Sequence, residues 1–231
     1  RPEESWAAKL SGAWTQAMSP WSLTTLVPSS MVLLPIAPYG HAKRLPAPPI
    51  PRIADIERTL KELPLSRRHG ESLATLLTTD ALEHHMVLPP AVEERFARIE
   101  SEYAARDRLR TFGLKPRKTI LLYGPPGCGK SLGAKRLAWN TGLPLMKVRF
   151  DVLISSYFGE SATNLRAIFF AAKERPCVLL LDECDFIARS RINSKDIGEA
   201  SRIVNSLLQL MEEYDAPGLL VATTGVESSL G

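Results

Sequence analysis

Short apolar runs alternate with amphipathic segments through the second half of this 231-residue chain. The runs have the length and the content of leucine and β-branched residues that are typical of strands buried in a parallel sheet. The predicted strands are residues 119–123, 144–150, 177–182 and 219–223. The helices predicted between them are residues 131–141, 164–174 and 199–214. This alternation is typical of an α/β fold with a parallel sheet.

Upstream of these strands, the pattern of apolar residues predicts helices. Pro89-Pro90 opens a long amphipathic helix that ends at Gly113. Isoleucine and leucine residues at helical spacing predict a helix over 53–63 and a second one around residues 73–82. The predicted division is a small helical N-terminal region at residues 53–88 and a core domain at residues 89–231.

Residues 1–52 differ in composition from the rest of the chain. They hold three of the four tryptophans and end in the proline-rich stretch Leu45–Pro51, which favours an extended linker. The apolar run Leu26–Ala37 is interrupted by Pro28 and Pro35 and is too short to span a membrane. We expect a poorly ordered segment, with docking of a partner or packing against the core domain as the alternatives.

Composition places the chain among ordinary globular proteins. Hydrophobic residues make up 45% and charged residues 23% of the sequence, and the formal net charge is +4. An ordinary solvated surface accounts for this mildly basic balance, so nucleic acid is not indicated as a partner. The three cysteines form no C-x-x-C pair and resemble reduced thiols, from which we expect a cytoplasmic location.

The clearest chemical signal is the stretch GPPGCGKS, Gly124–Ser131, which fits the phosphate-binding P-loop pattern G-x-x-x-x-G-K-[ST]. Its glycines allow successive backbone N–H groups to point at phosphate oxygens. Lys130 would reach the β- and γ-phosphates of ATP, and the Ser131 hydroxyl would ligate Mg²⁺. The predicted nucleotide-binding residues are Gly124, Pro125, Pro126, Gly127, Cys128, Gly129, Lys130, Ser131 and Leu132. A glycine-rich turn without a ligand is the alternative.

A second signal follows about 50 residues downstream. The apolar strand that begins at Cys177 ends in Asp182 and Glu183, which is a Walker B pattern. The strand would carry Asp182 to the carboxyl edge of the sheet beside the P-loop, where it would hold the Mg²⁺ shell. Glu183 would orient and deprotonate the attacking water. The predicted metal-binding residues are therefore Ser131 and Asp182, and Glu183 is the predicted general base.

Three segments together resemble the AAA branch of the AAA+ ATPases: Leu122–Ser131, Ser155–Ser161 and Leu179–Asp185. The resemblance runs from about Pro89 to Leu230. It implies a P-loop NTPase core, a three-layer sandwich around a parallel sheet of strand order 5-1-4-3-2. It also implies ATP and Mg²⁺ as cofactors, a homo-hexamer for the full-length protein, and a polypeptide substrate.

Within this resemblance, Tyr157, Phe158 and Gly159 match the aromatic–hydrophobic–glycine pore loop of the family. That loop grips an extended polypeptide in the centre of the ring, where an aromatic ring can press between side chains of any sequence. The alternative is that Tyr157 and Phe158 are core residues.

The sequence also departs from the family pattern. Thr224 occupies the sensor 1 position, where the family has an Asn that helps to place the attacking water, and the shorter hydroxyl predicts slower hydrolysis. The family's fifth strand, arginine fingers and helical lid would lie beyond Gly231. We therefore expect a fragment of a longer ATPase in which the P-loop strand is an unprotected sheet edge.

Three functions remain open from the sequence. The first is an AAA ATPase that couples hydrolysis to remodelling or unfolding of proteins through a central pore. The second is a nucleotide-binding regulatory protein with little turnover, which Thr224 favours. The third is a helper ATPase in DNA transactions, against which the Tyr157-Phe158-Gly159 segment argues.

Overall fold

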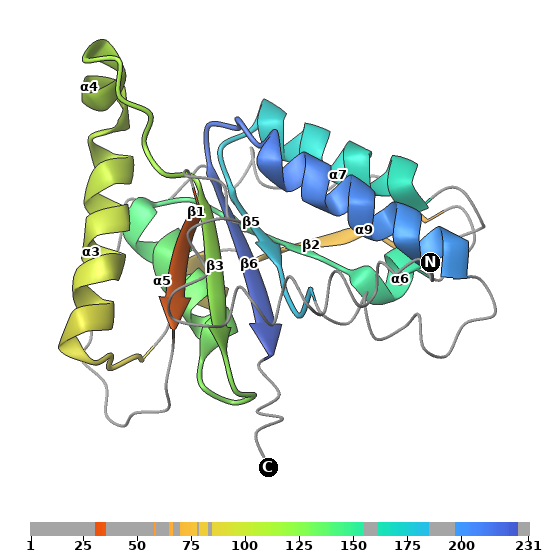
Figure 1. Ribbon diagram of the computed structural model, residues 1–231, viewed down its shortest axis with the longest axis horizontal. Helices are drawn as coiled ribbons and strands as arrows, with labels where there is room; N and C mark the ends of the chain where they lie inside the picture. Colours follow the sequence, from red (N-terminus) through yellow and green to blue (C-terminus); the bar gives the residue numbers. More distant parts are fainter. Residues whose placement is uncertain are drawn as a thin grey trace, which may run out of the picture.

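The computed structural model describes residues 31–35, 58, 65–66, 70–77, 79–82, 85–154, 161–184 and 197–225. In this part of the chain, one sheet of six strands lies between helices on both of its faces (Figure 1). The expected three-layer α/β architecture is confirmed.

The sheet has the strand order β1-β3-β6-β5-β4-β2. The strands are β1 (Met31–Pro35), β2 (Ala74–Leu77), β3 (Thr119–Gly124), β4 (Leu145–Val148), β5 (Val178–Leu181) and β6 (Leu219–Gly225). All neighbouring strands pair in parallel except β2, which is antiparallel to β4. The strands β3, β4, β5 and β6 correspond to the four predicted strands, and their spatial order β3-β6-β5-β4 is the expected 1-4-3-2.

The helices divide between the two faces of the sheet (Figure 1). The longer ones are α3 (Pro90–Ala104) and α5 (Lys130–Thr141) on one face, and α7 (Ser161–Glu174) and α9 (Ile197–Glu212) on the other. The short ones are η1 (Thr79–Leu82), α4 (Arg106–Thr111) and α6 (Phe150–Ile154). In β3, Ile120 and Leu122 pack with α3 and α5, whereas Leu121 packs on the opposite face. Burial on both faces explains why the strands are continuous apolar runs.

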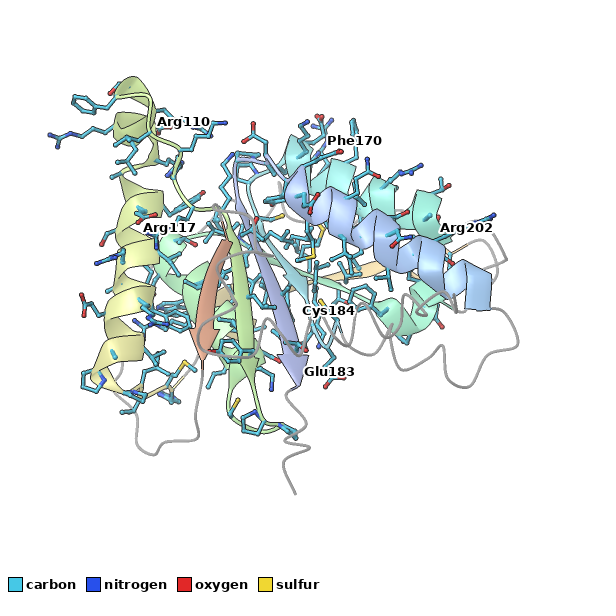
Figure 2. The ribbon with its side chains drawn as sticks, viewed as in Figure 1. Arg110, Arg117, Phe170, Glu183, Cys184 and Arg202 are labelled. Atoms are coloured by element: carbon cyan, nitrogen blue, oxygen red, sulfur yellow. The ribbon has the colours of Figure 1, made fainter. Side chains whose placement is uncertain are left out.

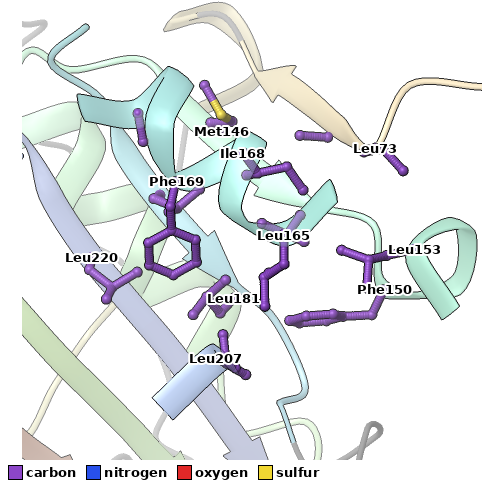
Figure 3. Packing of buried hydrophobic residues seen from close by; sticks show 14 of the residues in the cluster. Leu73, Met146, Phe150, Leu153, Leu165, Ile168, Phe169, Leu181, Leu207 and Leu220 are labelled. Carbon is purple, nitrogen blue, oxygen red and sulfur yellow. The ribbon is translucent and has the colours of Figure 1, made fainter. Parts of the chain in front are cut away.

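On the α7 and α9 face, large apolar side chains form a dense core (Figure 3). Leu153 of α6 and Leu165 of α7 are fully buried there, beside Met146 of β4. Removing one such side chain from water contributes about 1.5–3 kcal/mol to folding. This packing holds the helices against the strands whose carboxyl ends carry the acidic motif.

The prediction of a helix around residues 73–82 is wrong for the first half of that segment, where the chain forms β2. Ala74 and Leu76 are buried and Thr75 is exposed, an alternation of period two. Leucines spaced over so few residues are compatible with a helix or a strand. Pairing with β4 decides between them, because it satisfies backbone groups at that edge of the sheet. Of the helix expected over residues 53–63, the structure describes only Arg58, which is helical.

The opposite edge of the sheet also differs from expectation. We predicted that β3 would be an unprotected edge, because we expected the fifth strand of the family to lie beyond Gly231. Instead, β1 pairs in parallel with β3 along its length, from Met31 opposite Thr119 to Pro35 opposite Tyr123. An apolar segment of the N-terminal region therefore takes the outer position, and its backbone groups satisfy those of β3. The other residues of the segment 1–52 lie outside the described residues.

An ion-pair cluster around a buried arginine joins α3 to the P-loop helix α5. Arg136 of α5 is 4% exposed and donates from both terminal nitrogens to Glu93, at 2.5 and 2.6 Å, and from Nε to Glu100 at 3.1 Å. Its guanidinium also lies over the ring of Phe96. The hydrogen bond from Arg136 holds the pKa of Glu93 below its ordinary value. The cluster fixes α3 on α5. The helix predicted to run from Pro89-Pro90 to Gly113 is interrupted at Ala105, so α3 and α4 are separate helices.

The segment that leads into β6 passes very close to the start of β5. A Cβ atom on Gly218 would lie 1.9 Å from the carbonyl oxygen of Cys177 and 2.7 Å from its backbone nitrogen. Next to this contact, the Leu219 N–H donates to the same carbonyl at 3.0 Å. Only glycine allows the backbone at position 218 to pass this close to Cys177, and this contact sets the register between β5 and β6.

We predict that Gly218→Ala lowers the free energy of unfolding by about 2 kcal/mol or more, because backbone atoms on both sides must move apart. Denaturant unfolding followed by circular dichroism measures the change. The control is Gly70→Ala, where φ is +64° but a Cβ atom meets nothing within 4 Å. There we expect only the cost of the left-handed conformation, about 1 kcal/mol. Equal losses in the two variants would contradict the assigned contact.

Candidate functional site

The P-loop has the strand–loop–helix geometry that its pattern predicts. β3 ends at Gly124, and α5 begins at Lys130. Gly127 and Gly129 have φ of +78° and +87°, a left-handed conformation that favours glycine. No side chain caps the start of α5, so the N–H groups of its first turn remain oriented toward the loop. An uncapped helix start behind a glycine turn is an anion-binding geometry.

The loop residues predicted to bind nucleotide form one curved segment. Pro125, Pro126 and Gly127 are exposed, Cys128 is buried, and Gly129 to Leu132 are half-buried. The Lys130 ammonium lies inside the curve, where it donates to the carbonyl oxygens of Gly124 and Pro125, both at 2.8 Å. The loop therefore presents one cation and a set of backbone donors at the same place.

The carboxylate of Asp182 joins the P-loop to the acidic motif. Its Oδ1 accepts hydrogen bonds from Ser131 Oγ and from Thr223 Oγ1, both at 2.8 Å, and its Oδ2 accepts from Lys147 Nζ at 2.6 Å. The Asp182 side chain is only 10% exposed. Burial raises the pKa of Asp182, but the hydrogen bonds from Lys147, Thr223 and Ser131 outweigh it and hold the pKa below its ordinary value. A charged carboxylate is thus held beside the P-loop serine.

Glu183 lies at the same edge of the sheet, near the end of β6 (Figure 2). Its side chain is exposed, and its φ of 56° is in the left-handed region, which costs a residue with a Cβ about 1–2 kcal/mol. The Glu183 N–H donates to Thr223 Oγ1 at 2.8 Å, and the Cys184 N–H donates to the Thr223 carbonyl at 2.9 Å. Thr223 therefore stabilises the strained turn that presents the glutamate to solvent.

Two residues of the cluster were missed by sequence reasoning, Thr223 and Lys147. The strand β6 was expected to contribute Thr224, which is buried and lies opposite Tyr123 of β3. The contact with Asp182 is made by Thr223, one position earlier. The role of Thr224 in placing water stays a prediction. Lys147 has a sequence signal, since it is the charged residue inside the apolar strand LMKV.

The donor atoms at this edge fit Mg²⁺. A serine hydroxyl and a carboxylate oxygen lie 2.8 Å apart, and such hard oxygen donors suit Mg²⁺, which takes one or two protein ligands and completes its shell with water and phosphate. In the part of the chain that the structure describes, no cluster of three or more His, Cys, Asp or Glu side chains forms a different kind of metal site.

The predicted pore-loop residues Tyr157, Phe158 and Gly159 lie between α6 and α7, outside the described residues. Beside Asp182 and Glu183, a cleft of about 480 Å³ extends toward β2 and the start of α6. Among the described helices, none combines the length and the apolar character needed to cross a membrane.

Comparison with known proteins shows what this sequence is similar to. Residues 120–230 match the model of the ATPase family associated with various cellular activities (AAA). The chain is 47% identical over 129 residues to the protein named uncharacterized AAA family ATPase y4kL of Sinorhizobium fredii (strain NBRC 101917 / NGR234). It is 44% identical over 117 residues to the peroxisomal ATPase PEX6 of Saccharomyces cerevisiae (strain ATCC 204508 / S288c).

These matches cover only part of each protein. They include 56% and 49% of this chain, but 39% of y4kL and 11% of PEX6. The aligned region is thus a minor part of either relative.

We predict that Thr223→Val destabilises the protein by about 1–3 kcal/mol, because it leaves the Glu183 N–H without its acceptor and removes a donor to a buried carboxylate. Urea unfolding measures the loss. Thr75→Val, at an exposed position of β2, is the control and should change stability by less than about 0.5 kcal/mol. A Thr223 variant as stable as the control would show that these two hydrogen bonds do not hold the turn.

Proposed function

We propose that this chain is an AAA-family ATPase that binds Mg-ATP at the carboxyl edge of its sheet and hydrolyses it, and the match of residues 120–230 to the AAA model supports this. The observation that carries the proposal is the 2.8 Å hydrogen bond between Ser131 and Asp182. It joins the first turn of the P-loop helix to the end of β5, residues separated by 51 positions in the chain. Phosphoryl transfer needs this combination of anion binding and metal binding in one place.

Each residue then has a defined task. The backbone N–H groups of residues 124–132 and the Lys130 ammonium bind the phosphates. Ser131 and Asp182 would hold Mg²⁺, and the metal would supply charge neutralisation at the phosphates. Glu183 orients the attacking water and accepts its proton. The exposed position of Glu183, turned out from the sheet edge, supports that task because the water must reach it from solvent.

We further propose that the protein assembles as a homo-hexamer that remodels or unfolds polypeptides through a central pore. The match of Tyr157, Phe158 and Gly159 to the pore-loop pattern supports this part of the proposal. We expect the protein to act in the cytoplasm, because the three cysteines form no C-x-x-C pair and do not have the spacing of a disulfide framework.

A regulatory protein that binds nucleotide with little turnover is the second candidate. The observation that favours it is Thr224 at the sensor 1 position, where its short side chain is buried in β6. Such a regulatory protein would bind nucleotide with the same residues as the ATPase and would differ only in its rate of ATP hydrolysis.

We predict that Lys130→Ala weakens ATP binding at least about tenfold, because it removes a charge-assisted contact to the phosphates. Glu183→Gln should retain nucleotide affinity and lose any hydrolysis by about 10²-fold or more. Binding of a fluorescent ATP analogue and release of phosphate, each over a range of protein concentrations, measure the two effects. Glu174→Gln, an exposed carboxylate at the end of α7, is the control.

The outcomes separate the candidates. Hydrolysis that rises with protein concentration and disappears in Glu183→Gln supports a self-assembling ATPase. Tight binding without turnover in the unmodified chain supports the regulatory protein. Unchanged ATP affinity in Lys130→Ala would contradict both.

For the pore, we predict that Tyr157→Ala reduces binding of a fluorescent unfolded polypeptide by about tenfold, since truncating an aromatic residue that anchors an interface costs more than about 1 kcal/mol. The binding is measured with ATP in the Glu183→Gln background, which retains bound nucleotide. Phe170→Ala, an aromatic side chain that is 64% exposed on α7, is the matched control. Equal polypeptide affinity in both variants would argue against a pore role for Tyr157.

A further inference from the structure

The two oxygens of Asp182 have different partners. Oδ1 accepts from Ser131 and Thr223, on the side of the P-loop. Among the described residues, the partner of Oδ2 is a cation, the Lys147 ammonium, which donates to it at 2.6 Å. The carboxylate is therefore shared between the proposed metal position and a lysine from β4.

Lys147 comes from a strand on the other side of β5 from the P-loop strand. In the strand order β3-β6-β5-β4, β4 lies beyond β5, whereas β3, which leads into the P-loop, lies before it. The Lys147 side chain is 44% exposed and lines the cleft of about 480 Å³ together with Asp182 and Glu183. Water and ions reach this ammonium, and the cleft gives it room to leave the carboxylate.

Two other positively charged side chains near the cleft, Arg149 and Lys130, contact groups other than Asp182. Arg149 pairs with Glu71 at 3.0 Å and with Asp151 at 3.1 Å. The Lys130 ammonium donates to the P-loop carbonyl oxygens. Within the described residues, Lys147 thus supplies the positive charge that neutralises the nearly buried Asp182.

We propose that Lys147 is a positioning residue that acts as a built-in counter-ion of Asp182 and weakens the binding of Mg²⁺ at the nucleotide site. The inference rests on the proposed function, since it concerns the metal that accompanies ATP. When Mg²⁺ occupies the site, two cations share one carboxylate and repel each other, unless the lysine moves into the cleft. Without the metal, the same lysine offsets the cost of a charged carboxylate that is shielded from water.

This role predicts two effects of opposite sign in Lys147→Met, which retains the aliphatic stem. The concentration of Mg²⁺ that half-saturates the complex with a fluorescent ADP analogue should fall at least about threefold, because a repelling charge is gone. The melting temperature without metal and nucleotide should fall, because Asp182 loses its counter-ion. A purely structural lysine would weaken both metal binding and stability.

The experiment titrates Mg²⁺ into the analogue complex of each variant and follows its fluorescence, with thermal unfolding measured in parallel. Lys147→Arg keeps the cation and should behave as the unmodified chain. Arg149→Met removes a neighbouring cation that pairs with Glu71 and Asp151, and should leave the Mg²⁺ dependence unchanged. Lys147→Gln repeats the test without the charge if the methionine variant does not fold.

A half-saturating Mg²⁺ concentration that is unchanged or higher in Lys147→Met would overturn the assignment of Lys147. If the unmodified chain binds the analogue with no response to Mg²⁺, or does not bind it, the proposed function itself fails and this inference fails with it. The Mg²⁺ titration of the unmodified chain distinguishes the two failures, because it shows a response only if the proposed function holds.

Discussion

The carboxylate of Asp182 is the point on which the site depends. It is 10% exposed, yet it receives hydrogen bonds from side chains on α5, β4 and β6. A charged carboxylate so shielded from water is stable only when its oxygens are satisfied. The three donors therefore hold the P-loop helix and two strands in a fixed relation to the end of β5. Displacing any one of these elements would remove a hydrogen bond from the Asp182 carboxylate.

The parallel pairing of β6 between β3 and β5 makes this convergence possible. Parallel strands end at the same edge, so the P-loop after β3, the acidic turn after β5 and the threonines of β6 meet there. The close passage of Gly218 past Cys177 sets the register, and Thr223 then lies where its hydroxyl meets both Asp182 and the Glu183 N–H. The strained backbone of Glu183 is supported by this contact.

The outer parts of the molecule support the site indirectly. The cluster of Arg136 with Glu93 and Glu100 fixes α3 on the P-loop helix, and the apolar core around α7 holds the opposite face. At the two sheet edges, β1 and β2 come from segments upstream of residue 89, outside the core domain predicted at residues 89–231. Their backbone pairing protects strands that are apolar on both faces.

The sequence by itself determined the four central strands, the P-loop and the acidic pair, because continuous apolar runs and the spacing of glycines, lysine and acids are local properties of the chain. Tertiary structure alone decided the edge strands, since residues 31–35 and 74–77 adopt β structure only by pairing with distant partners. It also decided that Thr223 and Lys147 contact Asp182, residues 41 and 35 positions away. The direction of a side chain depends on strand register, and register is a property of the assembled sheet.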